Sequence, residues 1–373
     1  MMVSSPAAAE PPPLTILHVI PTLEGGGAER QLSMLATEQS RRGHDVHLAV
    51  RRTGVHVQTV RDCGVQIHEL GDMRSTNPML LVAIRRAIFR VRPSIVQTWL
   101  PQMDILGGLA ALIARIPWIV SERTSGDYYT EIPVVARLRL FLGQFASAVI
   151  ANSDGGEKYW HAAAYRSPKL ITVRNALDVA RIGEATAPDF PDCFPNPVLL
   201  VVGRFTREKA LEIIVRALGD LSMRSAVNVL IIGEGSERPA LEREIEAASL
   251  SGCVKILPYQ RDWWRWLKLA AGLISMSRYE GNPNVVLEAM AGCCPVILSD
   301  IPAHREIADA SSALFVPVDD VGALASAMGN LLVDKDAALL RAAQAHERVR
   351  SMTVTAMADA YEAVYREVLD GIN

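Results

Sequence analysis

Short, largely apolar runs alternate with helical patterns along most of the chain. Apolar runs of about four to eight residues bounded by turn-forming residues are typical of buried strands. Strands that alternate with helices pair in parallel, since each helix returns the chain to the same edge of the sheet. The sequence therefore predicts an α/β protein with parallel sheets. The predicted strands are residues 14–20, 44–51, 65–70, 95–98, 118–121, 148–153, 198–202, 229–232, 254–257 and 271–276, with a last strand at 296–299.

The chain of 373 residues has room for two domains of about 150 residues each. Four prolines fall between residues 183 and 197, a composition typical of a linker. We expect a disordered, Pro- and Ala-rich tail at the start and an amphipathic helix at the end. The predicted parts are the tail 1–13, the first domain 14–182, the linker 183–197, the second domain 198–352 and the C-terminal helical segment 353–373.

Composition argues against several broad classes of protein. No basic segment precedes an apolar core near the start of the sequence, so we expect no secretory signal. The most apolar run, residues 105–120, contains Arg115 and Pro117 and is too short to span a bilayer. The five cysteines show no metal-ligand spacing and are odd in number, which indicates free thiols in a reducing compartment. We expect a cytoplasmic protein.

Charge is divided unevenly between the two halves. Residues 1–181 carry 20 Lys plus Arg against 15 Asp plus Glu, whereas the remainder carries 18 against 26. Basic amphipathic helices bind anionic membrane surfaces, so we consider a peripheral position on the inner membrane face; ordinary helices with solvated arginines explain the pattern equally well. Aromatic residues are not interleaved with the basic ones, and we expect no nucleic-acid partner. The arginines concerned are Arg85, Arg86, Arg90, Arg92, Arg137 and Arg139.

The stretch SRYEGNPNVVLEAMAGCCP, residues 277–295, reads as a loop that enters a helix. It follows a predicted strand, so the loop lies at the carboxyl end of the sheet, where open α/β sheets bind ligands. We expect Asn284 to be the N-cap of this helix. The free amides of Asn284 and Val285 then point into the ligand space, at a helix end that carries partial positive charge. Such an end binds phosphate.

Two carboxylates in this stretch, Glu280 and Glu288, have seven residues between them. A carboxylate accepts hydrogen bonds from paired hydroxyls, while the helix amides bind an anion. A nucleotide sugar offers both vicinal hydroxyls and a diphosphate, so it meets both demands. Two glutamates at this spacing, taken alone, are more often solvated or helix-capping. The surrounding string EGNPN followed by LEAMA is much more specific.

The stretch resembles the E-x7-E signature of the retaining, nucleotide-sugar-dependent glycosyltransferases of family 4. The common family pattern is EGFPNVLLEAMA, and this chain reads EGNPNVVLEAMA, with Asn282 in place of the aromatic residue. The resemblance implies a GT-B fold, in which two Rossmann-like domains face each other across a cleft and the C-terminal helix crosses back to the N-terminal domain. It also implies that a donor phosphate oxygen accepts the proton of the acceptor, so that no protein base is strictly required.

A glycine-rich loop, GGGAER, lies between the first predicted strand and a helical pattern. A dinucleotide fingerprint needs a third glycine where Arg30 stands, so the signal for NAD is weak. The loop resembles the family 4 segment that borders the donor diphosphate, which assigns Gly26 and Gly27 to the donor side. A tight turn that needs small residues is the alternative.

Two loops of the second domain also resemble donor-binding segments of the family. Arg204 and Lys209 follow the strand 198–202, and a guanidinium and an ammonium at this place would neutralise a diphosphate. Gly233 belongs to a GEG turn, beside which a base and ribose would lie against the backbone.

Polar residues at the ends of first-domain segments are candidates for the acceptor side. Glu122 and Arg123 directly follow the strand 118–121 and are expected to face the cleft, where many family members carry a histidine. Arg174 lies in the segment that closes the first domain, where a turn is the simpler explanation. The three tryptophans of DWWRWLKLAAG are expected to pack in the core and between domains, in preference to forming a carbohydrate platform.

These expectations combine into one hypothesis about function. Arg204 and Lys209 bind the phosphates, Glu288 binds the ribose hydroxyls, and Glu280 lies near the sugar of a donor that we expect to be linked to UDP. The acceptor is expected to be lipid-linked or a glycan, in cell-surface polysaccharide synthesis. We expect no cofactor and no metal, and we interpret the D-x-D sequence at residues 334–336 as a solvated turn. A sugar-nucleotide epimerase of the same architecture and a non-catalytic sugar-binding protein are the alternatives.

Overall fold

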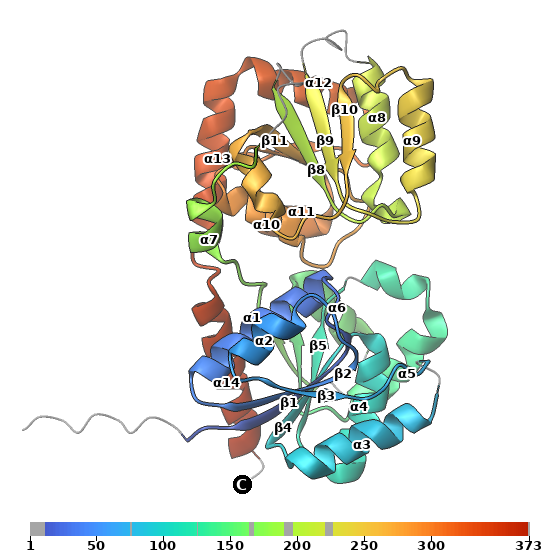
Figure 1. The fold of residues 1–373 in the computed structure, drawn as a ribbon, viewed down its shortest axis with the longest axis vertical. Coiled ribbons are helices and arrows are strands. Elements are labelled where there is room, and N and C mark those ends of the chain that lie inside the picture. Colours follow the sequence, from blue (N-terminus) through green and yellow to red (C-terminus); the bar gives the residue numbers. More distant parts are fainter. Residues whose placement is uncertain are drawn as a thin grey trace, which may run out of the picture.

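The computed structural model describes residues 12–74, 77–124, 126–163, 168–189, 197–220 and 227–371. Two α/β domains lie one above the other along the long axis of the molecule (Figure 1). Each contains one sheet in which every pair of neighbouring strands is parallel. The expected α/β fold with two Rossmann-like domains is therefore confirmed.

The N-terminal sheet has seven strands in the order β3-β2-β1-β4-β5-β6-β7. Its strands are β1 (Thr15–Thr22), β2 (Asp45–Arg52), β3 (Gln66–Glu69), β4 (Ile95–Trp99), β5 (Trp118–Glu122), β6 (Ala148–Ala151) and β7 (Lys169–Thr172). The helices are α1 (Gly27–Arg41), α2 (Val57–Asp62), α3 (Met79–Val91), α4 (Pro101–Ala114), α5 (Pro133–Gly143) and α6 (Asp154–Ala163), with a 3-10 turn at Gly126–Thr130.

The C-terminal sheet has six strands in the order β10-β9-β8-β11-β12-β13. Its strands are β8 (Val198–Val202), β9 (Asn228–Ile232), β10 (Val254–Leu257), β11 (Ala270–Ser275), β12 (Val296–Ser299) and β13 (Leu314–Val316). The helices are α8 (Leu211–Asp220), α9 (Arg238–Ala247), α10 (Asn284–Ala291), α11 (Pro302–Ile307), α12 (Val321–Val333) and α13 (Lys335–Val349), with 3-10 turns η2 (Arg207–Lys209) and η3 (Trp263–Lys268).

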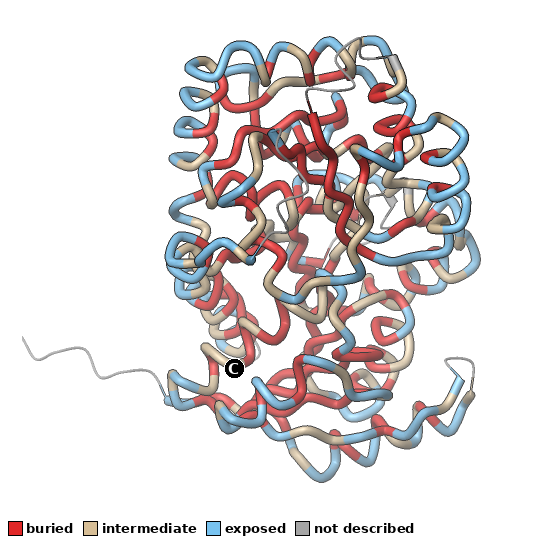
Figure 2. Tube along the Cα trace, turned by 45° about the horizontal axis from the view of Figure 1, so that its top comes forward, coloured by how far each residue is buried: buried red, intermediate tan, exposed pale blue. Residues whose placement is uncertain are grey.

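The central strands are buried on both faces, as their apolar sequences require (Figure 2). In each sheet the strand order reverses beside the first strand, between β1 and β4 and between β8 and β11. Reversal leaves a crevice outside the carboxyl ends of these strands. The glycine loop follows β1, while the Arg204–Lys209 loop follows β8 and the loop with Glu280 follows β11. The topology therefore places these three loops at the two switch points.

The polypeptide crosses between the domains twice. In the first crossing, Ala176 packs in the N-terminal core and Leu177 in the C-terminal core. Helix α7 (Val179–Glu184) then packs on α10, so the chain leaves the first domain ahead of the linker expected at 183–197. The apolar side chain of Ile182 explains this, because it is buried in the second core.

In the second crossing, α14 (Val354–Asp370) returns to the N-terminal domain, as the family resemblance implied (Figure 1). Its tyrosines, Tyr361 and Tyr365, are fully buried in the N-terminal core. Two short strands, β7 and β13, were not predicted, and β12 is therefore not the last strand. Both are edge strands of only a few residues, which give a weak pattern. Among the described helices, none is both long and apolar enough to cross a bilayer.

Candidate active site

Glu280 is held by the loop that follows β8. Its Oε1 accepts hydrogen bonds from Lys209 Nζ at 2.5 Å and from Ser277 Oγ at 2.7 Å. Burial alone would raise the pKa of Glu280, but the charge of Lys209 and these hydrogen bonds outweigh it and lower that pKa. Glu280 is therefore an ionised carboxylate at the carboxyl edge of the C-terminal sheet.

Arg204, the second predicted phosphate ligand, lies apart from this pair. Its side chain is 77% exposed, and its guanidinium is 3.7 Å from Glu208. Lys209 and Arg204 both follow strand β8, but their side chains have different partners. Arg204 thus remains free to turn toward an anion, whereas Lys209 is already oriented by Glu280.

Glu288 lies in α10 and forms an ion pair with Arg30 of α1, the helix that follows the glycine loop. The Glu288 side chain is 2% exposed. Arg30 belongs to the GGGAER segment, and no role for it was predicted from the sequence. The signal for such a role was its place in the first turn of a helix that faces the opposite domain.

The glycine loop touches the helix α10 directly. A Cβ atom on Gly27 would lie 2.6 Å from Nδ2 of Asn284, so the Asn284 side chain or the loop would have to shift to admit it. The Oδ1 of Asn284 accepts a hydrogen bond from Asn175 at 2.6 Å, and Asn175 in turn accepts one from Arg123. Asn284 is the first residue of α10 and Pro283 its N-cap, so the expected N-cap was wrong by one residue. The side chain of Asn284 bonds across the cleft and does not cap its own helix.

Two buried side chains near Glu280 have polar atoms that lack partners among the described residues. Asn282 is 8% exposed, and neither its Nδ2 nor its Oδ1 has a hydrogen-bond partner. The Nε2 of His304 is also unpaired, while its Nδ1 lies 2.8 Å from the carbonyl oxygen of Ser299. Burial lowers the pKa of His304, although Glu280 opposes that effect. Buried polar atoms in proteins are usually paired, so these atoms are available to a ligand or to water.

Glu122 does not face the cleft, which corrects the acceptor-side assignment. It is fully buried, and its carboxylate accepts hydrogen bonds from Arg139 at 2.6 Å, Trp160 at 2.9 Å and Tyr129 at 2.9 Å. Arg139 also pairs with the buried Asp104 at 2.6 Å. Arg139 is thus a core residue, and the expectation that it faces a membrane is wrong as well.

The other two acceptor-side candidates, Arg123 and Arg174, have different kinds of partner. Arg123 joins Asn175 to α14 through Tyr361, at 3.4 Å from the Tyr361 hydroxyl. Arg174 pairs with Glu306 of the C-terminal domain and, at 3.1 Å, with Asp154. Arg174 therefore links the two domains directly, whereas Arg123 reaches the C-terminal domain only through Asn175, which bonds to Asn284.

Gly233 has a packing reason for being glycine. It has a positive φ of 151°, and a Cβ atom there would overlap the carbonyl oxygen of Gly203 in the Arg204–Lys209 loop. The tryptophans behave as expected, since Trp263 and Trp264 are buried in the C-terminal core. Asp334 of the D-x-D sequence caps α13 by accepting the amide of Ala337. Within the described ranges, no group of three or more His, Cys, Asp or Glu side chains is arranged to hold a metal ion.

Comparison with known families and proteins agrees with this arrangement. Residues 25–181 match the family described as Glycosyltransferase Family 4, and residues 196–334 match Glycosyl transferases group 1. The D-inositol 3-phosphate glycosyltransferase of Nocardia farcinica is 30% identical over 402 aligned residues, which cover 94% of this chain and 84% of that protein. The chain belongs to glycosyltransferase family 4.

This family 4 glycosyltransferase has further relatives of known kind. A phosphatidyl-myo-inositol mannosyltransferase of Mycolicibacterium smegmatis is 28% identical over 276 residues, covering 72% of this chain and 69% of that protein. The crystal structure of HepE from Anabaena in complex with UDP-glucose superposes with a TM-score of 0.84 at 18% identity, covering 96% of this chain and all of that one. The structural similarity shows the GT-B fold for this family 4 glycosyltransferase.

Proposed function

We propose that this glycosyltransferase moves a sugar from a nucleotide diphosphate sugar to a lipid-linked acceptor, with retention of the anomeric configuration. We base this on the arrangement of two carboxylates and a glycine loop, which face one another. Glu280 is fixed on Lys209, Glu288 is buried in α10, and Gly27 contacts the first residue of that helix. The donor lies between these groups.

The phosphates of the donor bind to Lys209, Arg204 and the first amides of α10, those of Asn284 and Val285. Departure of the nucleoside diphosphate develops negative charge on its terminal oxygens. Fixed cations and helix-terminal amides stabilise that charge more in the transition state than in the ground state, which is the condition for catalysis. The proposal includes no metal ion.

The sugar of the donor lies against Glu280, Asn282 and His304. Asn282 and His304 supply polar atoms that have no partner in the described part of the chain. Hydroxyl groups of a sugar both donate and accept hydrogen bonds, so they satisfy an amide and an imidazole together. A donor phosphate oxygen takes the proton of the acceptor, as the family resemblance implies.

The acceptor is proposed to arrive from an anionic membrane surface on the inner face. Helix α5 exposes an apolar stripe of Val134, Leu138 and Phe141, with Val134 75% exposed. Helix α3 exposes Phe89, which is 78% exposed. An apolar face that enters the acyl boundary and arginines that pair with lipid phosphates are the features of interfacial helices.

The charges on this face fit an anionic partner. Helices α3 and α5 contain no acidic residue, and the one acidic residue of α4, Asp104, is buried. Helix α4 packs between α3 and α5, so the three form a continuous layer. Tyr279, beside Glu280, donates a hydrogen bond of 2.8 Å to Glu131, which lies two residues before α5. The layer therefore begins at the cleft.

The mannosyltransferase of Mycolicibacterium smegmatis, named for a phosphatidyl acceptor, supports the same class of acceptor here. The exposed arginines of the layer are Arg85, Arg86, Arg90, Arg92 and Arg137.

The experiment that tests the proposal has two stages. A panel of nucleotide sugars is first screened for thermal stabilisation of the protein, since a ligand that binds the folded state raises its melting temperature. The stabilising donor is then incubated with membrane lipid extract, and the anomeric configuration of the product is determined. We expect UDP-linked donors to stabilise the protein and the product to retain configuration. A sugar epimerised without acceptor, or binding without nucleotide release for every extract, would reject the proposal.

A further inference from the structure

Arg30 of the N-terminal domain reaches into the donor side of the cleft. It lies in the first turn of α1, and its Nη1 pairs with Oε1 of Glu288 in the C-terminal domain. Within the described residues, Arg30 is the one ion-pair partner of Glu288. The buried carboxylate of one domain is thus compensated by a cation of the other.

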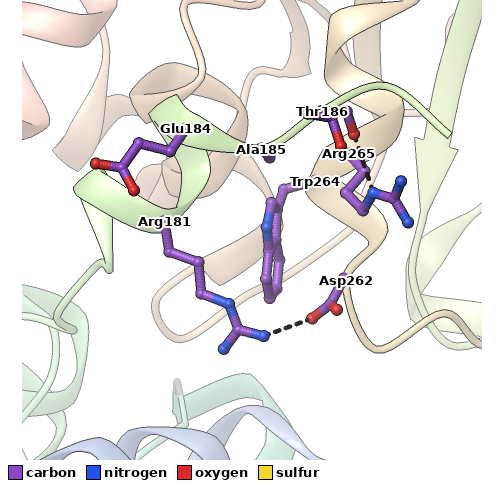
Figure 3. Close-up of a pocket in the computed structure, with 7 residues that line it drawn as sticks. All are labelled: Arg181, Glu184, Ala185, Thr186, Asp262, Trp264 and Arg265. Carbon is purple, nitrogen blue, oxygen red and sulfur yellow. Dashed lines mark hydrogen bonds and ion pairs between the residues drawn. The ribbon is translucent and has the colours of Figure 1, made fainter.

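A second contact fixes the position of the Arg30 guanidinium. It lies 4.8 Å from the ring centroid of Trp264 in η3, and the guanidinium of Arg181 lies 5.1 Å from the same centroid. Arg181 is anchored by Asp262 at 3.0 Å, and the close-up shows it beside the indole (Figure 3). A cation over a desolvated indole is attracted by the ring quadrupole. The C-terminal domain therefore holds Arg30 in place whenever the two domains are closed.

One oxygen of Glu288 lacks a well-aligned hydrogen bond, although the indole of Trp263 interacts with this carboxylate. Its Oε2 is buried and has no hydrogen bond of acceptable geometry among the described residues. Burial raises the pKa of Glu288, while Arg30 and the neighbouring Trp263 oppose that effect. A buried carboxylate oxygen that lacks a donor is costly unless a ligand supplies one.

We propose that Arg30 is a positioning residue of the donor site, which holds Glu288 by Oε1 so that Oε2 accepts a ribose hydroxyl of the nucleotide. This rests on the proposed function, because the nucleotide supplies the hydroxyl. Since Arg30 and Glu288 belong to different domains, the ion pair forms only when the cleft closes. Nucleotide binding and closure therefore favour each other by the same factor.

The test is a titration of UDP into four proteins: wild type, Arg30→Ala, Arg30→Lys and Arg61→Ala. For each protein, X-ray scattering measures the radius of gyration before UDP is added and at saturation. Arg61 is the matched control, because it forms a half-exposed ion pair with Glu69 at 3.6 Å in the same domain. We expect Arg30→Ala to bind UDP at least tenfold more weakly and to lose the UDP-induced compaction. Arg30→Lys should recover part of the affinity, and Arg61→Ala should match wild type.

A double-mutant cycle with Glu288→Gln shows whether Arg30 acts through Glu288. If it does, the double variant binds UDP no more weakly than Glu288→Gln alone. A folded Arg30→Ala protein that binds UDP within twofold of wild type and compacts normally would overturn this inference alone, as would fully additive losses in the cycle. Wild-type protein that binds neither UDP nor another nucleoside diphosphate would overturn the proposed function itself.

Discussion

Lys209 and Glu280 come from loops after two neighbouring strands, and Lys209 Nζ lies 2.5 Å from Glu280 Oε1. The pair couples the proposed phosphate ligand to the carboxylate beside the sugar. Loss of the Lys209 ammonium therefore raises the pKa of Glu280.

Replacing Lys209 by Ala tests this coupling. Without the ammonium, burial dominates and raises the pKa of Glu280, so the acidic limb of the kcat/KM profile should move to higher pH. The sign follows from the wild type, where the lowered pKa keeps Glu280 ionised to lower pH and its stabilising contribution is lost as pH falls through that pKa. UDP affinity, measured by calorimetry, should fall at least tenfold, about 1.4 kcal/mol. Lys209→Arg, which keeps the charge, should retain most affinity; an unshifted acidic limb in Lys209→Ala would contradict the coupling.

We predict that Gly27 is needed for contact between the domains. In Gly27→Ala the new methyl group meets Asn284, so the Asn284–Asn175 hydrogen bond breaks and turnover should fall tenfold or more. Gly329→Ala in α12 is the control, since no atom lies within 4 Å of the new Cβ, and it should raise the free energy of unfolding by up to about 1 kcal/mol. Turnover that is equal in the two variants would show that the close approach is not required.

The buried position of Arg139 predicts a large effect on stability. Arg139→Ala leaves Glu122 and Asp104 as buried, uncompensated carboxylates and should lower the free energy of unfolding by about 3–5 kcal/mol. Arg137→Ala, on the exposed side of the same helix, should change it by less than about 0.5 kcal/mol. Urea denaturation of both variants measures the difference, and similar midpoints would place Arg139 outside the core.

The acid stability of the protein should depend on His18. Burial lowers the pKa of His18 from 6.5 to about 4, against the opposing hydrogen bond to Gln39. Between these pH values the unfolded chain binds a proton that the folded state does not, so stability falls as pH is lowered. From pH 7 to pH 5 this contribution is about 2 kcal/mol. Urea denaturation at both pH values should show a smaller loss for His18→Gln than for wild type, and an equal loss would contradict the assignment.

Membrane binding should depend on the apolar stripe of α5. Flotation with vesicles of phosphatidylglycerol and phosphatidylcholine should recover wild-type protein, and the double variant Leu138→Gln/Phe141→Gln should stay unbound. The control is Leu339→Gln/Leu340→Gln, which changes two residues that are 61% and 65% exposed on the other domain and should float like wild type. Wild type that shows no preference for the anionic lipid would remove the membrane from the proposal.

The positions of Glu280 and Lys209 in the fold could be predicted from the sequence because local order determines them. A strand followed by a loop and a helix puts Glu280 and Lys209 at the carboxyl edge of a parallel sheet. Arg30 was missed because its partner, Glu288, lies in the other domain, and such a pair leaves no local pattern.

Glu122 was misplaced because its buried partners come from later helices. Arg139 and Trp160 draw its carboxylate into the core, although a polar residue at a strand end normally faces the ligand crevice. A signal for Arg139 was present: Ala136, Arg139 and Gly143 share one helical face, and small residues there indicate close packing. The basic residues of α5 made this packed face hard to recognise from the sequence.

The return of α14 means that the N-terminal half of the sequence does not make up the N-terminal domain on its own. A ribosome has to complete nearly the whole chain before Tyr361 and Tyr365 can fill their places beneath α1 and β4. A fragment that stops near Ala176 would expose this apolar surface and is expected to aggregate. Any chimera that exchanges N-terminal domains between relatives therefore has to transplant the last helix together with the first half.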